Sequence, residues 1–141
     1  MTLKDKEQKI KQEFEQLHDW QDKYEYILYL GNRLPKQDNT FRTEDKLIYG
    51  CQSKVWLDAK LIGMKVIFDA DSDALIPKGL IAMMIIVYSG RYPFEIISSK
   101  ASFISEIGFH NFLTPIRSNG LLLFLKKMKF YAKNFEDDYC N

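Results

Sequence analysis

The spacing of apolar residues changes once along this 141-residue chain, and that change limits the fold more than any other feature. Between Val55 and Ala70, apolar and polar side chains alternate, as in antiparallel strands with one buried face. Gly63 lies in the middle of this stretch, where a turn would join the two strands. We therefore predict a β-hairpin whose buried face carries Val55, Leu57, Ala59 and Leu61 on one strand and Val66, Phe68 and Ala70 on the other.

Helical spacing precedes the hairpin. Apolar residues within 3–17 recur at intervals of three and four, which predicts one amphipathic helix. Asp19 is placed to cap a second helix, which Gly31 and Pro35 would end. The polar segment 36–46 then predicts a loop.

Helical spacing also follows the hairpin. The apolar run 75–88 has the length of a buried helix, and the acidic and hydroxyl residues at 71–73 are candidates for its N-cap. Short helical pieces are predicted at 94–97 and 102–107. A last helix would start at Thr114-Pro115 or at Ser118 and carry an apolar stripe to Phe135.

Grouped strands with helices on both sides in sequence indicate the α+β class, with a small antiparallel sheet flanked by helices. The length and a hydrophobic content of 46% suit one domain over residues 1–141, with one core. We expect that core to span about 3–135 and the acidic tail 136–141 to fray.

Charge and hydropathy exclude several function classes. Twenty basic and nineteen acidic residues nearly cancel, so we expect neither nucleic acid nor an anionic membrane as a partner. The longest apolar run, 80–88, has nine residues, whereas a membrane-spanning helix needs about 20. The charged segment 1–14 lacks the apolar core of a secretory signal, so a cytoplasmic protein is expected.

The chain has two cysteines, Cys51 and Cys140. A cytosolic chain of this size does not need a disulfide, and glutathione keeps such thiols reduced. Because the sequence has no CxxC, HExxH or Cys/His cluster, we expect no metal site and no cofactor in this chain.

Cys51 is the candidate reactive residue. It follows Gly50 in a connection between the short apolar segment 47–49, predicted as a strand, and the first strand of the hairpin. Glycine lets the backbone bend and lets a partner approach the sulfur. Persulfide transfer needs only a thiolate that reaches the donor's terminal sulfur. The alternative is a packed core cysteine, which the spacing alone favours.

Five segments, in order, resemble the SufE family of sulfur-acceptor proteins and together span residues 20–121. They are Trp20-Gln21-Asp22-Lys23-Tyr24, Leu30-Gly31-Asn32-Arg33-Leu34-Pro35, Gly50-Cys51-Gln52-Ser53-Lys54-Val55-Trp56, Asp71-Ser72-Asp73-Ala74 with Lys78-Gly79-Leu80-Ile81-Ala82, and Leu113-Thr114-Pro115-Ile116-Arg117-Ser118-Asn119-Gly120-Leu121.

The resemblance implies a fold similar to the NifU/IscU scaffold and a role for Cys51 as sulfur acceptor. A SufS-type cysteine desulfurase would form a persulfide on its own cysteine, and Cys51 would take the outer sulfur as a persulfide. The SufBCD iron–sulfur scaffold would receive it next. Pyridoxal phosphate would belong to the desulfurase and not to this chain. The sequence does not separate SufE from CsdE-type relatives and leaves the oligomeric state open, a homodimer included.

Other residues are candidates for supporting roles. Gly50 would bend the loop, and Gln52 and Ser53 would donate hydrogen bonds to the sulfur or hold the turn. Asp73 would cap the following helix or hold the Cys51 loop closed. Arg117 would pair structurally or lie beside Cys51, where a cation lowers the pKa of a thiol.

One position departs from the family pattern. Members often have histidine directly before the Leu-Ser/Thr-Pro segment, where this chain has Phe112. His110 is the nearest histidine, and we assign it no catalytic role.

Two alternatives stay open. The chain would be an adaptor that activates a desulfurase without carrying sulfur, or an iron–sulfur scaffold, which would need more ligands than one well-placed cysteine. We also expect the Cys51 side chain to be sheltered in the free protein, with docking on the desulfurase drawing the loop outward.

Overall fold

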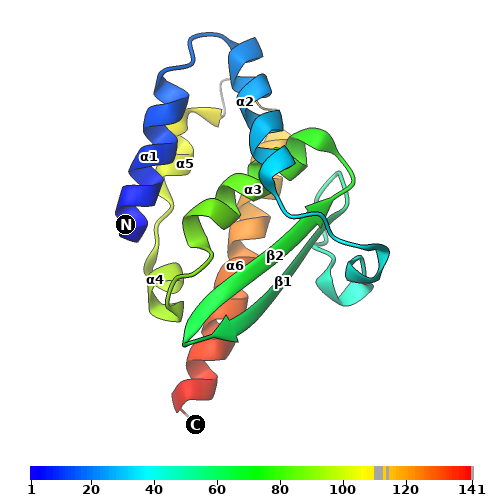
Figure 1. Cartoon of the computed structure of the whole chain (residues 1–141), viewed down its shortest axis with the longest axis vertical. Helices are drawn as coiled ribbons and strands as arrows, with labels where there is room; N and C mark the ends of the chain where they lie inside the picture. The colour runs from blue at the N-terminus through cyan, green and yellow to red at the C-terminus, as the bar shows by residue number, and fades with distance from the viewer. Residues whose placement is uncertain (110–112, 114, 141) are drawn as a thin grey trace.

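The computed structural model describes residues 1–109, 113 and 115–140, with only the backbone for 115–118, 139 and 140 (Figure 1). The elements follow in this order: α1 (Leu3–Glu15), α2 (Trp20–Arg33), the 3-10 turns η1 (Asn39–Phe41) and η2 (Glu44–Lys46), β1 (Val55–Ile62), β2 (Lys65–Ser72), α3 (Leu75–Tyr88), α4 (Pro93–Ser98), α5 (Ser102–Ile107) and α6 (Pro115–Cys140). The predicted α+β class is confirmed.

The structure contains the predicted antiparallel hairpin, and residues of the predicted buried face lie opposite one another. β1 and β2 pair antiparallel, with Leu57 opposite Ala70 and Ala59 opposite Phe68. Leu57, Phe68 and Ala70 are buried. The turn places Gly63 at φ 55°, in the left-handed region where glycine is favoured. Side chains of one pleat face therefore form the base on which the helices pack.

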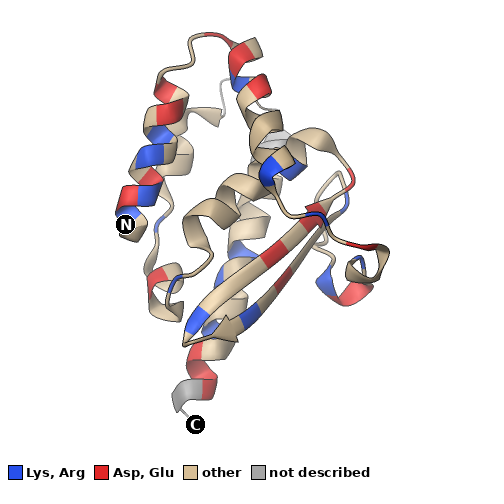
Figure 2. Cartoon of the chain, in the orientation of Figure 1, with Lys and Arg blue, Asp and Glu red and all other residues tan. Residues whose placement is uncertain are grey.

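Helices α3 and α6 cover the hairpin, α3 on β2 and α6 on β1 (Figure 1). Helix α2 packs on α3, α1 contacts both α3 and α5, and α4 contacts α6. Helix α3 is nearly free of charge, with Lys78 alone, whereas both signs mix along α1 and α2 (Figure 2). α3 is thus the central helix, and its fully buried side chains include Met83, Met84, Val87 and Tyr88.

Backbone-to-backbone packing sets the position of α3 against α2. A Cβ added at Gly79 would lie 2.0 Å from the carbonyl oxygen of Ile27. A Cβ at Gly31 would lie 3.0 Å from the backbone nitrogen of Gly79. Since real Cβ atoms essentially never approach below 3.0 Å, no side chain fits at residue 79 without moving a helix.

The start of α3 corrects the capping prediction. β2 continues through Ser72, and the N-cap of α3 is Ala74, with no side-chain capping bond. The prediction of an N-cap at residues 71–73 is therefore wrong. Long-range partners, described below, hold the side chains of Asp71, Ser72 and Asp73 instead.

Two other boundaries differ from the sequence pattern. The segment 47–49 forms one isolated bridge, between Leu47 and Trp56, in place of a strand. The predicted loop 36–46 contains η1 and η2. Helix α6 includes residues 136–140 of the predicted tail, and the fraying of that tail stays a prediction. Within the part of the chain that the structure describes, no helix is long and apolar enough to cross a membrane.

Candidate functional site

Cys51 lies in a short loop, residues 49–53, whose two ends are fixed to the hairpin. On one side, the N–H of Ile48 donates to the carbonyl of Val55 at 2.8 Å. On the other side, Lys54 makes three hydrogen bonds. Its N–H donates to Asp73 Oδ1 at 3.1 Å. Its carbonyl oxygen accepts from the Asp73 N–H at 3.2 Å and from the Ser72 hydroxyl at 2.9 Å. Among the described residues, no backbone hydrogen bond ties 49–53 to another element.

Gly50 makes the bend before Cys51. Its φ is 93°, in the left-handed region, and an added Cβ would lie 3.0 Å from Leu123 Cδ1 of α6. Both the backbone conformation and the close approach of α6 therefore favour glycine. The bend turns the following residue toward α3 and α6.

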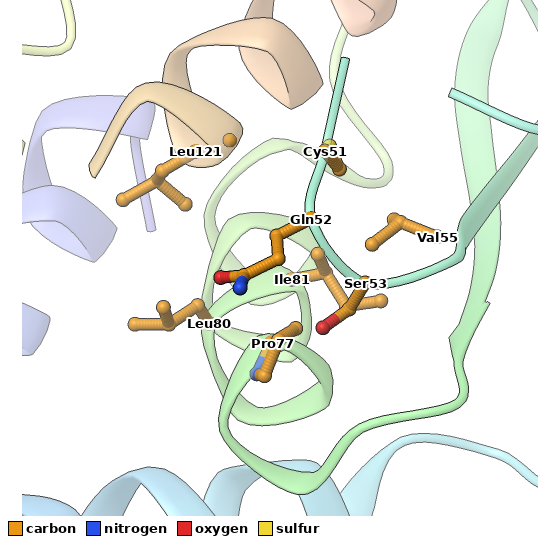
Figure 3. A pocket seen from close by; sticks show the side chains of 9 residues that line it. Cys51, Gln52, Ser53, Val55, Pro77, Leu80, Ile81 and Leu121 are labelled. Atoms are coloured by element: carbon orange, nitrogen blue, oxygen red, sulfur yellow. The ribbon is translucent and has the colours of Figure 1, made fainter. Parts of the chain in front are cut away.

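A cavity of about 290 Å³ opens beside Cys51 (Figure 3). Gln52 and Ser53 of the loop face Pro77, Leu80 and Ile81 of α3 across it, and Gly120 and Leu121 of α6 form another wall; Val55 completes the lining. The wall made by the helices is mostly apolar, and the loop contributes its polar groups. The cavity has room for more than the Cys51 side chain alone.

Burial raises the pKa of the half-buried Cys51 thiol above its usual value, and no described charged group offsets this effect. A thiol with a raised pKa is mostly protonated at neutral pH, and the protonated form is a poor nucleophile. In the free protein, the Cys51 thiol is therefore in its poorly nucleophilic, protonated form.

The structure brings most of the predicted site residues together. Gly50, Gln52 and Ser53 surround Cys51, and Asp73 fixes the end of the loop at Lys54, which matches the loop-holding alternative in place of the helix cap. The side chain of Arg117, together with His110 and Phe112, lies outside the described residues, so the predictions for these positions stay predictions.

Sequence reasoning missed a polar cluster behind the loop. Asp71 is only 5% exposed, and its Oδ2 accepts from Arg42 Nε at 2.9 Å. The Arg42 guanidinium also lies 4.8 Å from the centre of the Trp56 ring, a cation–π distance. The cluster fixes the end of β2, directly before the residues that hold Lys54. A lone arginine 29 residues from its partner carries no local signal in the sequence.

The described residues contain no group of three His, Cys, Asp or Glu side chains placed to hold a metal ion. The described site consists of the Cys51 thiol, a loop with fixed ends and a cavity, which places the chain among small α+β domains with a candidate thiol site.

The comparisons with known proteins identify that class. The model of the SufE family, described as an Fe-S metabolism associated domain, matches residues 8–132. The chain belongs to the SufE family. Membership indicates an accessory protein of sulfur transfer in iron–sulfur metabolism that works with a cysteine desulfurase.

Two relatives agree with this assignment, and one solved structure shares the fold. An uncharacterized SufE-like protein of Rhizobium etli is 38% identical over 122 residues, which cover 83% of this chain and 82% of that protein. SufE-like protein 1, chloroplastic/mitochondrial, of Arabidopsis thaliana is 35% identical over 95% of this chain, which spans 36% of that protein's length. The solution structure of a hypothetical protein from Thermus thermophilus has the same fold, with a TM-score of 0.78 at 19% identity over 94% of this chain and 96% of that one.

Proposed function

We propose that this chain accepts a sulfur atom from a SufS-type cysteine desulfurase as a persulfide on Cys51 and passes it to the SufBCD scaffold. The observation that carries the proposal is the position of the Cys51 thiol, on a loop between two fixed ends and beside a cavity with room for a further atom. Family membership supplies the class of partner.

The transfer step needs no oxidant and no metal. The Cys51 thiolate attacks the outer sulfur of the desulfurase cysteine persulfide, a new S–S bond forms at Cys51, and the donor's S–S bond breaks. The donor cysteine leaves as a thiolate and takes up the proton that Cys51 gave to solvent. One sulfane sulfur moves from the desulfurase cysteine to Cys51 with no net oxidation. Pyridoxal phosphate serves only the earlier step on the desulfurase.

Activation of the thiol belongs to the docked state in this proposal. Burial favours the protonated thiol in the free protein, so the step requires the loop to move Cys51 into a more polar setting. Docking on the desulfurase would draw residues 49–53 outward while the ends at Ile48 and Lys54 stay fixed. Amide hydrogen exchange of residues 48–54 with and without the desulfurase measures this movement, and unchanged protection would contradict it.

Mass spectrometry after incubation with a purified desulfurase and cysteine tests the carrier function. The Cys51 peptide gains about 32 Da, the mass of one sulfur. Cys51→Ser gains nothing and keeps its fold. If Cys51→Ser stimulates the desulfurase as well as the original chain does, the protein is a non-carrying adaptor. Mixing the loaded protein with SufBCD then tests the second transfer, which predicts loss of the added mass from Cys51.

A further inference from the structure

A second hollow begins at the first residue of the Cys51 loop. It has a volume of about 270 Å³ and opens between residues 47–49 on one side and Leu123, Lys126, Lys127 and Phe130 of α6 on the other. We call it the α6 groove. No residue that lines it also lines the Cys51 cavity, so the two hollows are separate. The transfer step proposed above uses the cavity and leaves the α6 groove without a role.

Two exposed aromatic side chains border the α6 groove. The exposed fraction is 69% for Tyr49 and 54% for Phe130. Exposed aromatic rings beside a hollow are typical anchors of protein–protein interfaces, because each ring buries a large apolar area when a partner binds. Within the part of the chain that the structure describes, no segment covers these two rings. The groove therefore offers apolar anchors to another molecule.

The charged groups that line the groove are both positive. Lys127 Nζ lies 4.7 Å from the centre of the Phe130 ring and 5.2 Å from that of the Tyr131 ring, at cation–π distances. Lys126 is exposed, and among the described residues neither lysine forms an ion pair. Lys127 thus helps to hold the Phe130 ring, and Lys126 is available to a carboxylate. Charge complementarity therefore favours a partner that is acidic at this place.

The α6 groove is also close to the thiol. Tyr49 is two residues before Cys51, so their Cα atoms are no more than about 7 Å apart. Leu123, in the opposite wall, packs toward the loop, because a Cβ added at Gly50 would lie 3.0 Å from Leu123 Cδ1. A cysteine desulfurase that brings a persulfide to Cys51 therefore lies over the groove or directly beside it.

We propose that the α6 groove is a docking site for an acidic surface element of the cysteine desulfurase that carries an apolar side chain. Tyr49 and Phe130 contact the apolar side chain, and Lys126 pairs with a carboxylate beside it. This inference rests on the proposed function and deepens it by naming a surface that selects the partner. The aromatic contacts supply affinity, and the lysine supplies orientation and discriminates against desulfurases that are basic at this place.

Binding of a purified SufS-type desulfurase tests the groove without any transfer of sulfur. All proteins compared carry Cys51→Ser, and calorimetric titration gives the Kd. We expect Phe130→Ala to raise the Kd by about tenfold or more, as loss of an interface anchor does. Phe94→Ala is the matched control, since Phe94 on α4 has a similar exposed fraction of 60%, and it should change the Kd less than twofold.

A charge reversal tests the second part of the site. Lys126→Glu should raise the Kd about fivefold at low salt and less at high salt, because salt screens exposed charges. Lys9→Glu, at an exposed position of α1, is its control and should leave the Kd within twofold.

Two results overturn the docking site. One is the same Kd for Phe130→Ala and Phe94→Ala. The other is a homodimer of the free chain, seen by light scattering, that Phe130→Ala dissociates, because the groove would then be an interface between two copies. Failure of the proposed function looks different, because the desulfurase would then add no mass to Cys51 of the original chain, whatever Kd values the groove variants show.

Discussion

The two sides of helix α3 are packed in opposite ways. Toward α2, the backbone of Gly79 touches the Ile27 carbonyl with no space for even a methyl group. Toward the Cys51 loop, Pro77, Leu80 and Ile81 of the same helix border a cavity, and a Cβ added at Gly120 across it would make only ordinary contact, at 3.7 Å from Cys51 Sγ. The side toward α2 is closely packed, and the side toward the Cys51 thiol borders a cavity. The comparison teaches that the glycine at 79 is required by close packing of two backbones, whereas the glycine at 120 is not required by packing.

The largest effect on stability should come from adding a side chain at the close contact between α2 and α3. Gly79→Ala forces the α2 and α3 backbones apart, and we expect a loss of about 3 kcal/mol in the free energy of unfolding, or roughly 10 °C in Tm. Gly120→Ala is the matched substitution on the open side and should gain up to about 1 kcal/mol from helix propensity. Urea and thermal unfolding measure both variants. Equal effects of the two would break the comparison.

Release of the loop end should give the next largest effect. Asp73→Ala removes the acceptor for the Lys54 N–H, a hydrogen bond worth about 1 kcal/mol. Opening of residues 49–53 should then be about fivefold more frequent, and alkylation of Cys51 by iodoacetamide about fivefold faster. Asp69→Ala, on β2 four residues earlier, is the control. An unchanged rate in Asp73→Ala would show that the Lys54 bonds do not restrain the loop.

The pH dependence of Cys51 alkylation tests whether the thiol beside the cavity is sheltered. Since burial raises the thiol pKa, the thiolate fraction should rise at higher pH than in an unfolded Cys51 peptide. The alkylation rate plotted against pH should therefore have its midpoint above that of the peptide, and Asp73→Ala should move the midpoint down. A midpoint at or below that of the peptide would mean that the thiol is not sheltered.

The smallest effect concerns Glu7, on the packed side of the molecule. Burial raises the Glu7 pKa, and the Ser99 hydroxyl donates to Glu7 Oε1 at 3.2 Å. Between the unfolded and the raised folded pKa, the native state binds more protons, so stability falls as pH rises through that window. Glu7→Gln keeps an acceptor for Ser99 and should gain a few tenths of a kcal/mol at neutral pH, because solvent screens this partly exposed group. Urea unfolding at pH 4 to 7 should show a flatter profile, and an unchanged profile would contradict this assignment.

Local patterns predicted the elements well where one face is buried. The alternation from Val55 to Ala70 predicted both strands and the face that they share, on which Leu57 lies opposite Ala70. The apolar run 75–88 likewise matched α3. These predictions depend only on the spacing of apolar residues within each segment and need no knowledge of partners distant in sequence.

Predictions failed where long-range partners compete with local chemistry. Asp71 and Ser72 have the residue types of helix caps, yet Arg42 and the Lys54 carbonyl hold them at the end of β2. The segment 47–49 pairs through one bridge because the chain turns away at Gly50. The candidate cysteine comes from its motif and its reactivity stays a prediction, whereas the role of Gly79 depends on a distance between two helices that no sequence period encodes.

The fixed ends of the Cys51 loop limit the distance over which the thiol can move. Cys51 is three residues from both Ile48 and Lys54, so even a fully extended chain carries its Cα no more than about 11 Å from either anchor. A loop with this reach cannot move its thiol between distant active centres. If Cys51 carries sulfur as proposed, each partner enzyme has to bring its own sulfur to the end of the hairpin. Transfer then requires close docking, and the shape of the partner's surface becomes the main determinant of specificity.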